Sequence, residues 1–165
     1  MAKVIIKLEN DISTDDIYPG RYMATVLPTE TPQFAFADLA AFNAQLKAKQ
    51  VPQGSFIVAG KNFGCGSSRE QAVSTLKGYE LVIIAKGFGR IFTQNAVNLG
   101  LNIVEAPGIA AAEGNELEIQ GDEVINVTQA RRFPIVPLPP ARQALIAAGG
   151  LIAYTRRRLM EKARP

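Results

Sequence analysis

The chain has 165 residues, of which 47% are hydrophobic and 20% are charged, and its net charge is +3. These proportions are typical of an ordered globular domain and exclude a disordered or fibrous chain. The sequence has one cysteine, which excludes an internal disulfide, and it has no histidine. Together these two counts exclude a Cys/His zinc site, a three-cysteine cluster site and a Ser-His-Asp triad built from this chain alone.

The length favours a single domain over residues 1–165. The longest apolar runs, such as 81–85, are far shorter than the roughly 20 residues that span a bilayer, so no membrane partner is expected. The first residues lack the apolar stretch of a secretory signal, which favours a cytoplasmic location. Aromatic and basic residues do not interleave, so no nucleic-acid partner is expected. The basic excess gathers near the C-terminus, where it predicts a solvated helix end: Arg156, Arg157, Arg158, Lys162 and Arg164.

The first fifty residues predict one strand, two irregular segments and one helix. Residues 4–8 are rich in β-branched side chains and predict a strand. Residues 10–20 are polar and end in Pro-Gly, and 25–32 contain two prolines, so both segments predict irregular structure. Residues 36–49 have helical spacing. Three apolar side chains are expected on one face of that helix: Leu39, Phe42 and Leu46.

The centre of the chain alternates strands with helices. Strands are predicted at 55–59, 81–85 and 102–104, with helices at 67–77 and 90–99 between them, each followed by a glycine. The strands are continuously apolar, which is typical of a parallel sheet covered by helices.

After residue 107 the pattern changes. Residues 116–119 and 123–127 alternate polar and apolar side chains around Gln-Gly-Asp, which predicts an antiparallel hairpin. Helices are predicted at 140–148 and 151–162. The fold class is therefore α/β, with a central parallel sheet, flanking helices and a smaller antiparallel part.

A glycine-rich loop joins the first central strand to the helix after it, where ligands bind in open parallel sheets. Gly64 and Gly66 let the backbone approach a ligand closely. Ser67 and Ser68 are predicted at cap positions of the helix, whose amino end attracts anions. Arg69 can grip a carboxylate with two parallel hydrogen bonds. The loop therefore predicts a site for a small carboxylate or phosphate.

A purely structural interpretation of this loop stays open on the residues alone. One serine would then be a helix cap, and Arg69 would be a surface residue paired with Glu70. The loop has neither the Gly-Lys-Ser/Thr of a Walker phosphate loop nor the third glycine of a dinucleotide-binding turn.

Residues 62–70 (NFGCGSSRE) resemble the signature of the swivel domain of the aconitase superfamily. Three further stretches agree in the same order: 11–22 (DISTDDIYPGRY), 85–101 (AKGFGRIFTQNAVNLGL) and 147–154 (AAGGLIAY). Together they cover nearly the whole chain, which is similar to the compact small subunits of the isopropylmalate dehydratase family. The resemblance implies a swivelling domain of three layers, β/β/α, that is one subunit of a hydro-lyase.

The resemblance also implies roles for individual residues. Ser67 matches the general base that removes the proton alpha to a substrate carboxylate, and Ser68 and Arg69 match positions that bind such a carboxylate. Asp15 matches an acidic active-site residue, although on the sequence alone it equally fits an Asx turn before Pro19-Gly20. The implied partners are a small dicarboxylate and a large subunit that carries a [4Fe-4S] cluster and a histidine acid. This chain is then expected to bind no metal itself.

Substrate choice is expected to lie in the segment after Pro19-Gly20: Met23, Ala24, Thr25 and Val26. Relatives that take an extra carboxylate place an arginine where Ala24 stands. Burying a third carboxylate among these side chains would leave a charge unpaired, whereas an isopropyl or methyl group would fit. We therefore expect 3-isopropylmalate rather than homoaconitate or citrate, with Arg21 close enough to complicate this preference.

Several positions depart from the family pattern. Gln71 replaces a common histidine, and Gly87 and Gly89 flank a phenylalanine where Ser-Phe-Ala is commoner, which is expected to loosen that turn. Cys65 is expected to be a small buried filler rather than a ligand. The alternatives are a small subunit acting on 2,3-dimethylmalate, citramalate, maleate or homoaconitate, and an anion-binding swivel module without catalysis.

Overall fold

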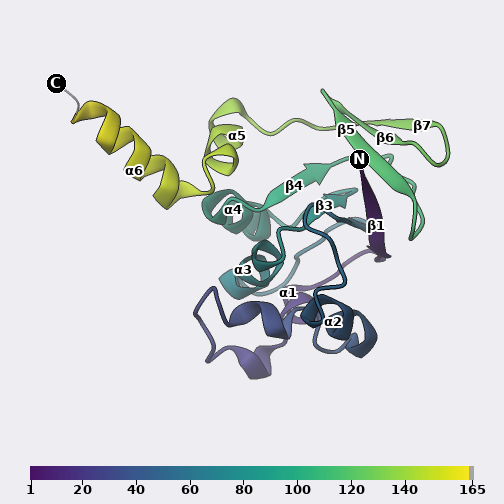
Figure 1. Cartoon of the computed structure of the whole chain (residues 1–165), viewed down its shortest axis with the longest axis horizontal. Helices are drawn as coiled ribbons and strands as arrows, with labels where there is room; N and C mark the ends of the chain where they lie inside the picture. Colours follow the sequence, from purple (N-terminus) through teal and green to yellow (C-terminus); the bar gives the residue numbers. More distant parts are fainter. Residues whose placement is uncertain (164–165) are drawn as a thin grey trace.

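The chain folds around one mixed sheet of seven strands in the order β4-β3-β2-β1-β5-β6-β7 (Figure 1). This computed structural model describes residues 1–163, so Arg164 of the basic C-terminal group lies outside it. Strands β1 to β4 are parallel, and β5 to β7 are antiparallel. The strands are β1 (Ala2–Lys7), β2 (Phe56–Ala59), β3 (Val82–Ala85), β4 (Asn102–Glu105), β5 (Glu116–Gln120), β6 (Glu123–Asn126) and β7 (Arg131–Pro134).

The described part of the chain has six α-helices. They are α1 (Thr14–Ile17), α2 (Ala40–Lys47), α3 (Glu70–Gly78), α4 (Arg90–Leu99), α5 (Pro140–Ala147) and α6 (Leu151–Lys162), with 3₁₀ turns at Gly20–Tyr22 and Thr31–Phe34. The bounds of α4 and α6 confirm the predicted ones, and Gly100 ends α4 in the left-handed conformation. Between residues 1 and 163 no helix has both the length and the apolar character needed to cross a membrane.

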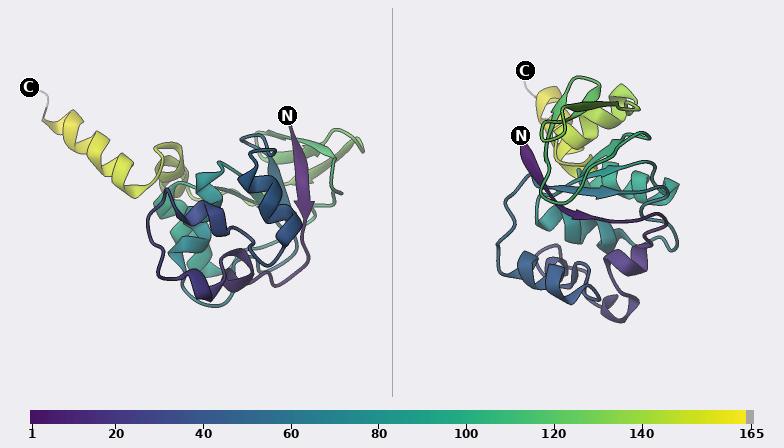
Figure 2. Two further views of the ribbon diagram at one scale, coloured as in Figure 1. Left: turned by 60° about the horizontal axis from the view of Figure 1, so that its bottom comes forward. Right: turned by 90° about the vertical axis from the view of Figure 1, so that its right-hand side faces the viewer.

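The side chains of the parallel strands alternate between two cores. Ile57 and Ile83 face the helices and join the larger core, whereas Val58 and Ile84 face the antiparallel strands and join the second core. The antiparallel strands therefore cover the sheet face that the helices leave free, which gives three layers (Figure 2). This confirms the α/β prediction. The antiparallel part joins the parallel part through the pairing of β1 with β5, so the two halves form one continuous curled sheet.

Three predictions for local structure were wrong. The helix expected at 36–49 begins only at Ala40, because Phe36 is buried in a left-handed conformation (φ 50°) that a helix cannot include. Leu39 therefore precedes the helix and is 42% exposed, whereas Phe42 and Leu46 are buried as expected. Residues 10–20 contain the short helix α1, and β7 was missed because Phe133 is its only buried side chain.

Gly64 fixes how the glycine-rich loop lies on α4. Its φ is +78°, and a Cβ there would lie 2.2 Å from Cγ of Phe92. Phe92 is buried and packs edge-on against Phe63, the residue before Gly64. The loop can approach α4 this closely only without a side chain at position 64.

Gly64→Ala is expected to lower the free energy of unfolding by about 2–4 kcal/mol, because left-handed strain adds to overpacking against Phe92. Gly114→Ala is the matched control, since Gly114 also has a positive φ (+81°) but a Cβ at this position would have no neighbour within 4 Å. It should lose only about 1–2 kcal/mol of backbone strain. Urea denaturation of both variants measures this, and equal losses would contradict the packing argument.

Candidate active site

Two loops run side by side at the carboxyl ends of β1 and β2. Because these strands are parallel neighbours, the chain leaves both at the same edge of the sheet. Backbone hydrogen bonds join the loops, among them Asp11 N–H to Lys61 O at 2.9 Å, Gly64 N–H to Ile12 O at 2.7 Å, and Thr14 N–H to Cys65 O at 2.8 Å. The loops therefore form one surface, to which residues far apart in the sequence contribute.

Helix α1 is held at this edge by its own cap. The Ser13 hydroxyl accepts a hydrogen bond from Asp16 N–H at 3.1 Å, and the Asp16 carboxylate accepts one from Ser13 N–H at 2.8 Å. This reciprocal capping box occupies Asp16 and leaves Asp15 free to turn toward the other loop. Thr14 adds a link, because its hydroxyl donates to the Ser67 carbonyl oxygen at 2.9 Å.

Asp15 and Arg69 meet across the two loops. Nη1 of Arg69 donates to Oδ1 of Asp15 and to the Tyr18 carbonyl oxygen at 3.1 Å. Gly20 N–H donates to the same Asp15 oxygen at 2.8 Å. In an Asx turn the aspartate side chain accepts from the N–H two residues further along the chain, whereas Asp15 accepts from Gly20, five residues along. Asp15 therefore does not form the Asx turn that the sequence left open. Together these bonds hold the pKa of Asp15 below its ordinary value.

Gly20 matters to this pair in a way that the sequence analysis missed. A Cβ at Gly20 would lie 3.2 Å from Arg69 Nη2 and 3.3 Å from Asp15 Oδ1. Pro19-Gly20 was interpreted only as a turn, but the glycine also leaves room for the guanidinium. The side chain of Arg69 is only 17% exposed. Its Nε and Nη2 donate no hydrogen bond to any of residues 1–163, so both remain available to a ligand.

The two serines are not helix caps, contrary to the prediction. Helix α3 begins at Glu70, and Arg69, in extended backbone conformation, precedes it without a side-chain cap. The Ser67 carbonyl oxygen accepts a hydrogen bond from Arg69 N–H at 2.9 Å. Residues 67–69 therefore form a tight turn that precedes the helix. Ser67 and Ser68 are exposed, and their hydroxyls form no hydrogen bond with any other residue that the structure describes. Their hydroxyls are therefore open to a ligand.

The segment of Met23, Ala24, Thr25 and Val26 lies beside the start of α3. The buried Tyr18 donates its hydroxyl to the Tyr22 and Thr25 carbonyl oxygens, at 3.1 and 3.3 Å. Gln71 Nε2 donates to the Met23 carbonyl oxygen at 3.5 Å. Met23 is 38% and Val26 65% exposed, and Ala24 is exposed too. The segment thus presents apolar side chains next to Glu70 and Gln71, the first residues of α3.

Arg21 is occupied elsewhere. Its guanidinium forms two hydrogen bonds with Asp38, at 2.5 and 3.3 Å, and lies 4.8 Å from the ring centre of Tyr22. Tyr22 in turn stacks on Phe34, with ring centres 4.1 Å apart. The ion pair lowers the pKa of Asp38 and raises that of Arg21. Arg21 is therefore held against Asp38 and Tyr22.

The departures from the family pattern have local explanations. Cys65 is half-buried, so the expectation of a buried filler was wrong, and its thiol lies 3.5 Å from the Asp11 carbonyl oxygen. The turn at Gly87 and Gly89 is not loose, because Phe63 N–H donates to Gly87 O and Gly89 N–H donates to Phe63 O. A Cβ at Gly89 would lie 2.8 Å from Gly64 O, so glycine allows tight packing there.

The residues of this chain do not fit an iron–sulfur cluster. Among residues 1–163 no three His, Cys, Asp or Glu side chains are grouped closely enough to hold a metal ion. The whole sequence has one cysteine and no histidine, whereas cluster sites need several thiolates.

Arg69→Gln is expected to raise the pKa of Asp15 toward its ordinary value of about 3.9, since Arg69 is the main cause of the lowered pKa. The ion pair stabilises the fold above that value, and the stabilisation is lost as the pH falls through the lower pKa of the folded chain. NMR titration of the side-chain carboxyl carbons measures the pKa values of Asp15 and Asp38. Arg21→Gln is the matched control and should raise the pKa of Asp38 instead. An Asp15 that responds more to the control would refute the pairing.

Known proteins resemble this chain along nearly its whole length. The sequence pattern of the aconitase C-terminal domain family matches residues 10–107. The 3-isopropylmalate dehydratase small subunit of Moorella thermoacetica is 43% identical over 155 residues, which cover 91% of each chain. The isopropylmalate/citramalate isomerase small subunit of Methanocaldococcus jannaschii is 39% identical and covers 94% of this chain and 93% of its own.

A solved structure agrees with these sequences. The crystal structure of a 3-isopropylmalate dehydratase from Methanocaldococcus jannaschii superposes with a TM-score of 0.87 at 34% identity, covering 98% of this chain and 96% of its own. The residues that form the two joined loops lie within the matched family region. The chain therefore belongs to the aconitase C-terminal domain family.

Proposed function

We propose that the chain is the small subunit of a 3-isopropylmalate dehydratase. This hydro-lyase would interconvert 2-isopropylmalate and 3-isopropylmalate by dehydration and rehydration, as a step of leucine biosynthesis in the cytoplasm, with residues 1–165 as one domain. The observation that carries the proposal is an exposed Ser67 two residues before Arg69, whose guanidinium is held by Asp15 and Tyr18 in the room that Gly20 leaves. The names of relatives that match more than nine-tenths of the chain support it.

Ser67 acts as the general base in this proposal. Its oxygen takes the proton from the carbon alpha to a substrate carboxylate, and the electron pair moves into that carboxylate, which gains negative charge. A serine is a weak base, so its alkoxide needs nearby positive charge. Arg69 supplies a full charge and the amino end of α3 a partial one. The two hydrogen bonds to the Ser67 carbonyl oxygen fix the backbone that carries the base.

Arg69 and Ser68 bind the carboxylate next to the reacting carbon. Nη1 of Arg69 is used by the protein, which leaves Nε and Nη2 for two hydrogen bonds to the substrate. Because the charge on this carboxylate grows as the proton leaves, the same bonds strengthen in the transition state. Asp15 keeps the guanidinium oriented and, at 62% side-chain exposure, can also reach a group on a partner.

A second subunit is needed to complete the reaction. The described residues contain no group of three metal ligands, so we assign the removal of the hydroxide to a metal centre on a large subunit. The [4Fe-4S] cluster implied by the family resemblance would belong there. The exposure of Ser67, Ser68, Met23 and Val26 supports a partner that covers this face. Excluding water would also strengthen the interaction of Arg69 with the substrate.

The apolar segment favours a substrate with a branched alkyl group. Met23, Ala24 and Val26 offer no partner for a third carboxylate, and the Arg21 guanidinium is paired with Asp38. Closing a partner over an unpaired carboxylate would be costly, whereas an isopropyl group would gain from burial.

Citramalate is the second candidate substrate. It differs from isopropylmalate in the size of an apolar group, and each methylene of such a difference is worth only about 1–3 kcal/mol in a hydrophobic pocket. The Methanocaldococcus jannaschii relative whose name includes both substrates favours this candidate. Comparing kcat/KM for the two compounds with the reconstituted enzyme separates the candidates.

Ser67→Ala is expected to lower kcat by about 10²–10⁴-fold, the usual contribution of a general base, without weakening assembly with the large subunit. The measurement is the alkene absorbance produced from isopropylmalate by the reconstituted pair. Ser68→Ala is the matched control: it removes a neighbouring exposed hydroxyl, and we expect it to raise KM more than it lowers kcat. A Ser67→Ala enzyme with normal kcat would show that another group is the base.

Ala24→Arg is expected to lower kcat/KM for isopropylmalate by about 10–100-fold, because it places a charge where the alkyl group would bind. The same change should raise activity toward homoaconitate, which can pair its third carboxylate with the new guanidinium. Ala24→Met adds similar length without charge and should not improve homoaconitate turnover. If both variants behave alike, position 24 acts through size and not through charge.

A further inference from the structure

Helix α6 projects away from the rest of the chain. In Figure 1 and in the left view of Figure 2 it leaves the body beside α4 and α5 and extends toward the C-terminus with little beside it. Its apolar side chains are strongly exposed: Leu151 45%, Ile152 75%, Leu159 63% and Met160 62%. An exposed amphipathic helix of this kind marks an interaction surface.

The apolar side chains of α6 form a seam with basic flanks. Ile152, Leu159 and Ala163 recur at spacings of seven and four, so they lie on one face of the helix. Arg156 flanks this seam on one side, and the helical period places Lys162 on the other. A partner that suits the seam is therefore apolar with acidic groups at its margin.

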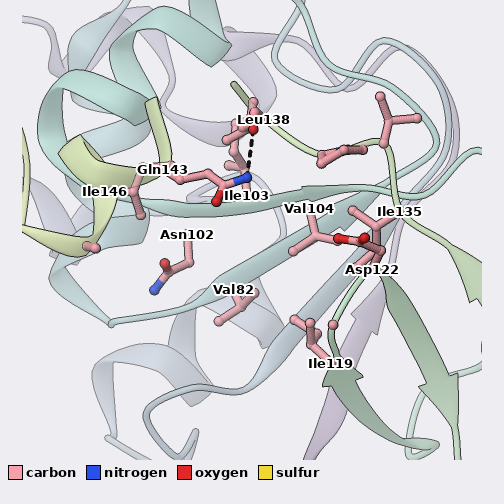
Figure 3. Close-up of a pocket in the computed structure, with 14 residues that line it drawn as sticks. Val82, Asn102, Ile103, Val104, Ile119, Asp122, Ile135, Leu138, Gln143 and Ile146 are labelled. Carbon is pink, nitrogen blue, oxygen red and sulfur yellow. Dashed lines mark hydrogen bonds between the residues drawn. The ribbon is translucent and has the colours of Figure 1, made fainter. Parts of the chain in front are cut away.

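The same chain carries an open groove of that kind (Figure 3). Its volume is about 520 Å³, and it lies between the edge strand β4, the β5–β6 turn and α5. Most of the lining is aliphatic, and Asp122 is the acidic side chain in it. The aliphatic side chains include Val82, Val104, Ile119, Ile135 and Ile146. Edge strands of sheets are usually covered by a helix or loop. The segment before α5 pairs with β4 only at its last residue, where Val136 N–H donates to Glu105 O at 2.8 Å.

Helix α6 is held away from the groove of its own chain. Gly149 and Gly150 connect it to α5 and pack against the end of α4, where a Cβ at Gly150 would lie 2.5 Å from Asn98 O. Gly150 has a φ of +112°, which other residues rarely adopt. This tight junction sets the direction of α6, so α6 does not cover the groove of its own chain.

We propose that α6 docks into this groove on a second copy of the chain, and that the two copies exchange their helices reciprocally. Each copy offers both surfaces, as a two-fold symmetric interface requires. Pairing α6 directly with α6 would bring together two helices whose charged side chains are mostly basic (Arg156, Arg157, Arg158 and Lys162 against Glu161), and these repel each other. The groove instead presents Asp122 beside aliphatic side chains.

The proposed interface leaves the candidate active site free. The groove includes Val82 and Asn102, the first residues of β3 and β4, whereas the site lies at the carboxyl ends of the parallel strands. Helix α6 also lies away from α1 in both views (Figures 1 and 2). A large subunit over the active site and a second copy at the groove can therefore bind together, and the proposal does not depend on the catalytic one.

Sedimentation equilibrium of the full chain tests the exchange. The wild type should sediment as a dimer with twice the 17.8 kDa of one chain. Leu159→Glu on the helix and Ile119→Glu in the groove should each raise the dimer dissociation constant at least about tenfold, because each places a charge where an aliphatic side chain is buried. Val127→Glu is the control: Val127 is 42% exposed, close to the 39% of Ile119, but lies outside both surfaces.

A charge exchange provides a second test with conservative surface changes. Asp122→Lys and Arg156→Glu should each weaken the dimer, and the double variant should recover most of the lost affinity. A monomeric wild type would overturn the proposal. So would a dimer that depends on Leu159 but not on Ile119, which would indicate pairing of α6 with α6. Loss of large-subunit binding in the Leu159→Glu variant, with the dimer intact, would assign the helix to the other partner.

Discussion

The joining of two loops at the ends of β1 and β2 is the constraint on which the rest of the site depends. Asp15 and Arg69 are 54 residues apart in the sequence, yet one guanidinium nitrogen bonds the Asp15 carboxylate. They meet because parallel neighbouring strands release the chain at one edge, where backbone bonds between residues 11–14 and 61–65 align the loops. Gly64 and Gly89 then let this pair of loops rest directly on the start of α4.

The electrostatics of the site follow from that geometry. Asp15 lowers the cost of keeping Arg69 mostly out of water, and Gly20 leaves the room that the pair needs. Only Nη1 of the Arg69 guanidinium donates hydrogen bonds within the described chain. The charge is therefore held in position while Nε and Nη2 remain able to bind a ligand. Exposed ion pairs contribute little to stability. The pair therefore matters chiefly for orientation, and more so once a partner excludes water.

The two proposed interfaces, one with a large subunit and one with a second copy of the chain, lie at opposite ends of the parallel strands. The carboxyl ends of the parallel strands carry the serines, Arg69 and the apolar segment around Ala24, all on an open face that suits a covering subunit. The amino ends of β3 and β4 border the groove. Helix α6 starts beside the carboxyl end of α4, which leads into β4. One small domain can thus take part in catalysis at one edge and in assembly at the other.

The sequence by itself determined the elements with strong local signals: the continuously apolar strands, the hairpin around Gly121, and the helices α4 and α6 with glycines at their boundaries. It also placed the Ser67–Arg69 motif, because the resemblance rests on contiguous residues. Only the tertiary structure decided that α3 starts at Glu70, that Phe36 is left-handed, and that Gly20 makes room for Arg69. Each of those features is imposed by a partner distant in the sequence, and local periodicity carries no trace of such a partner.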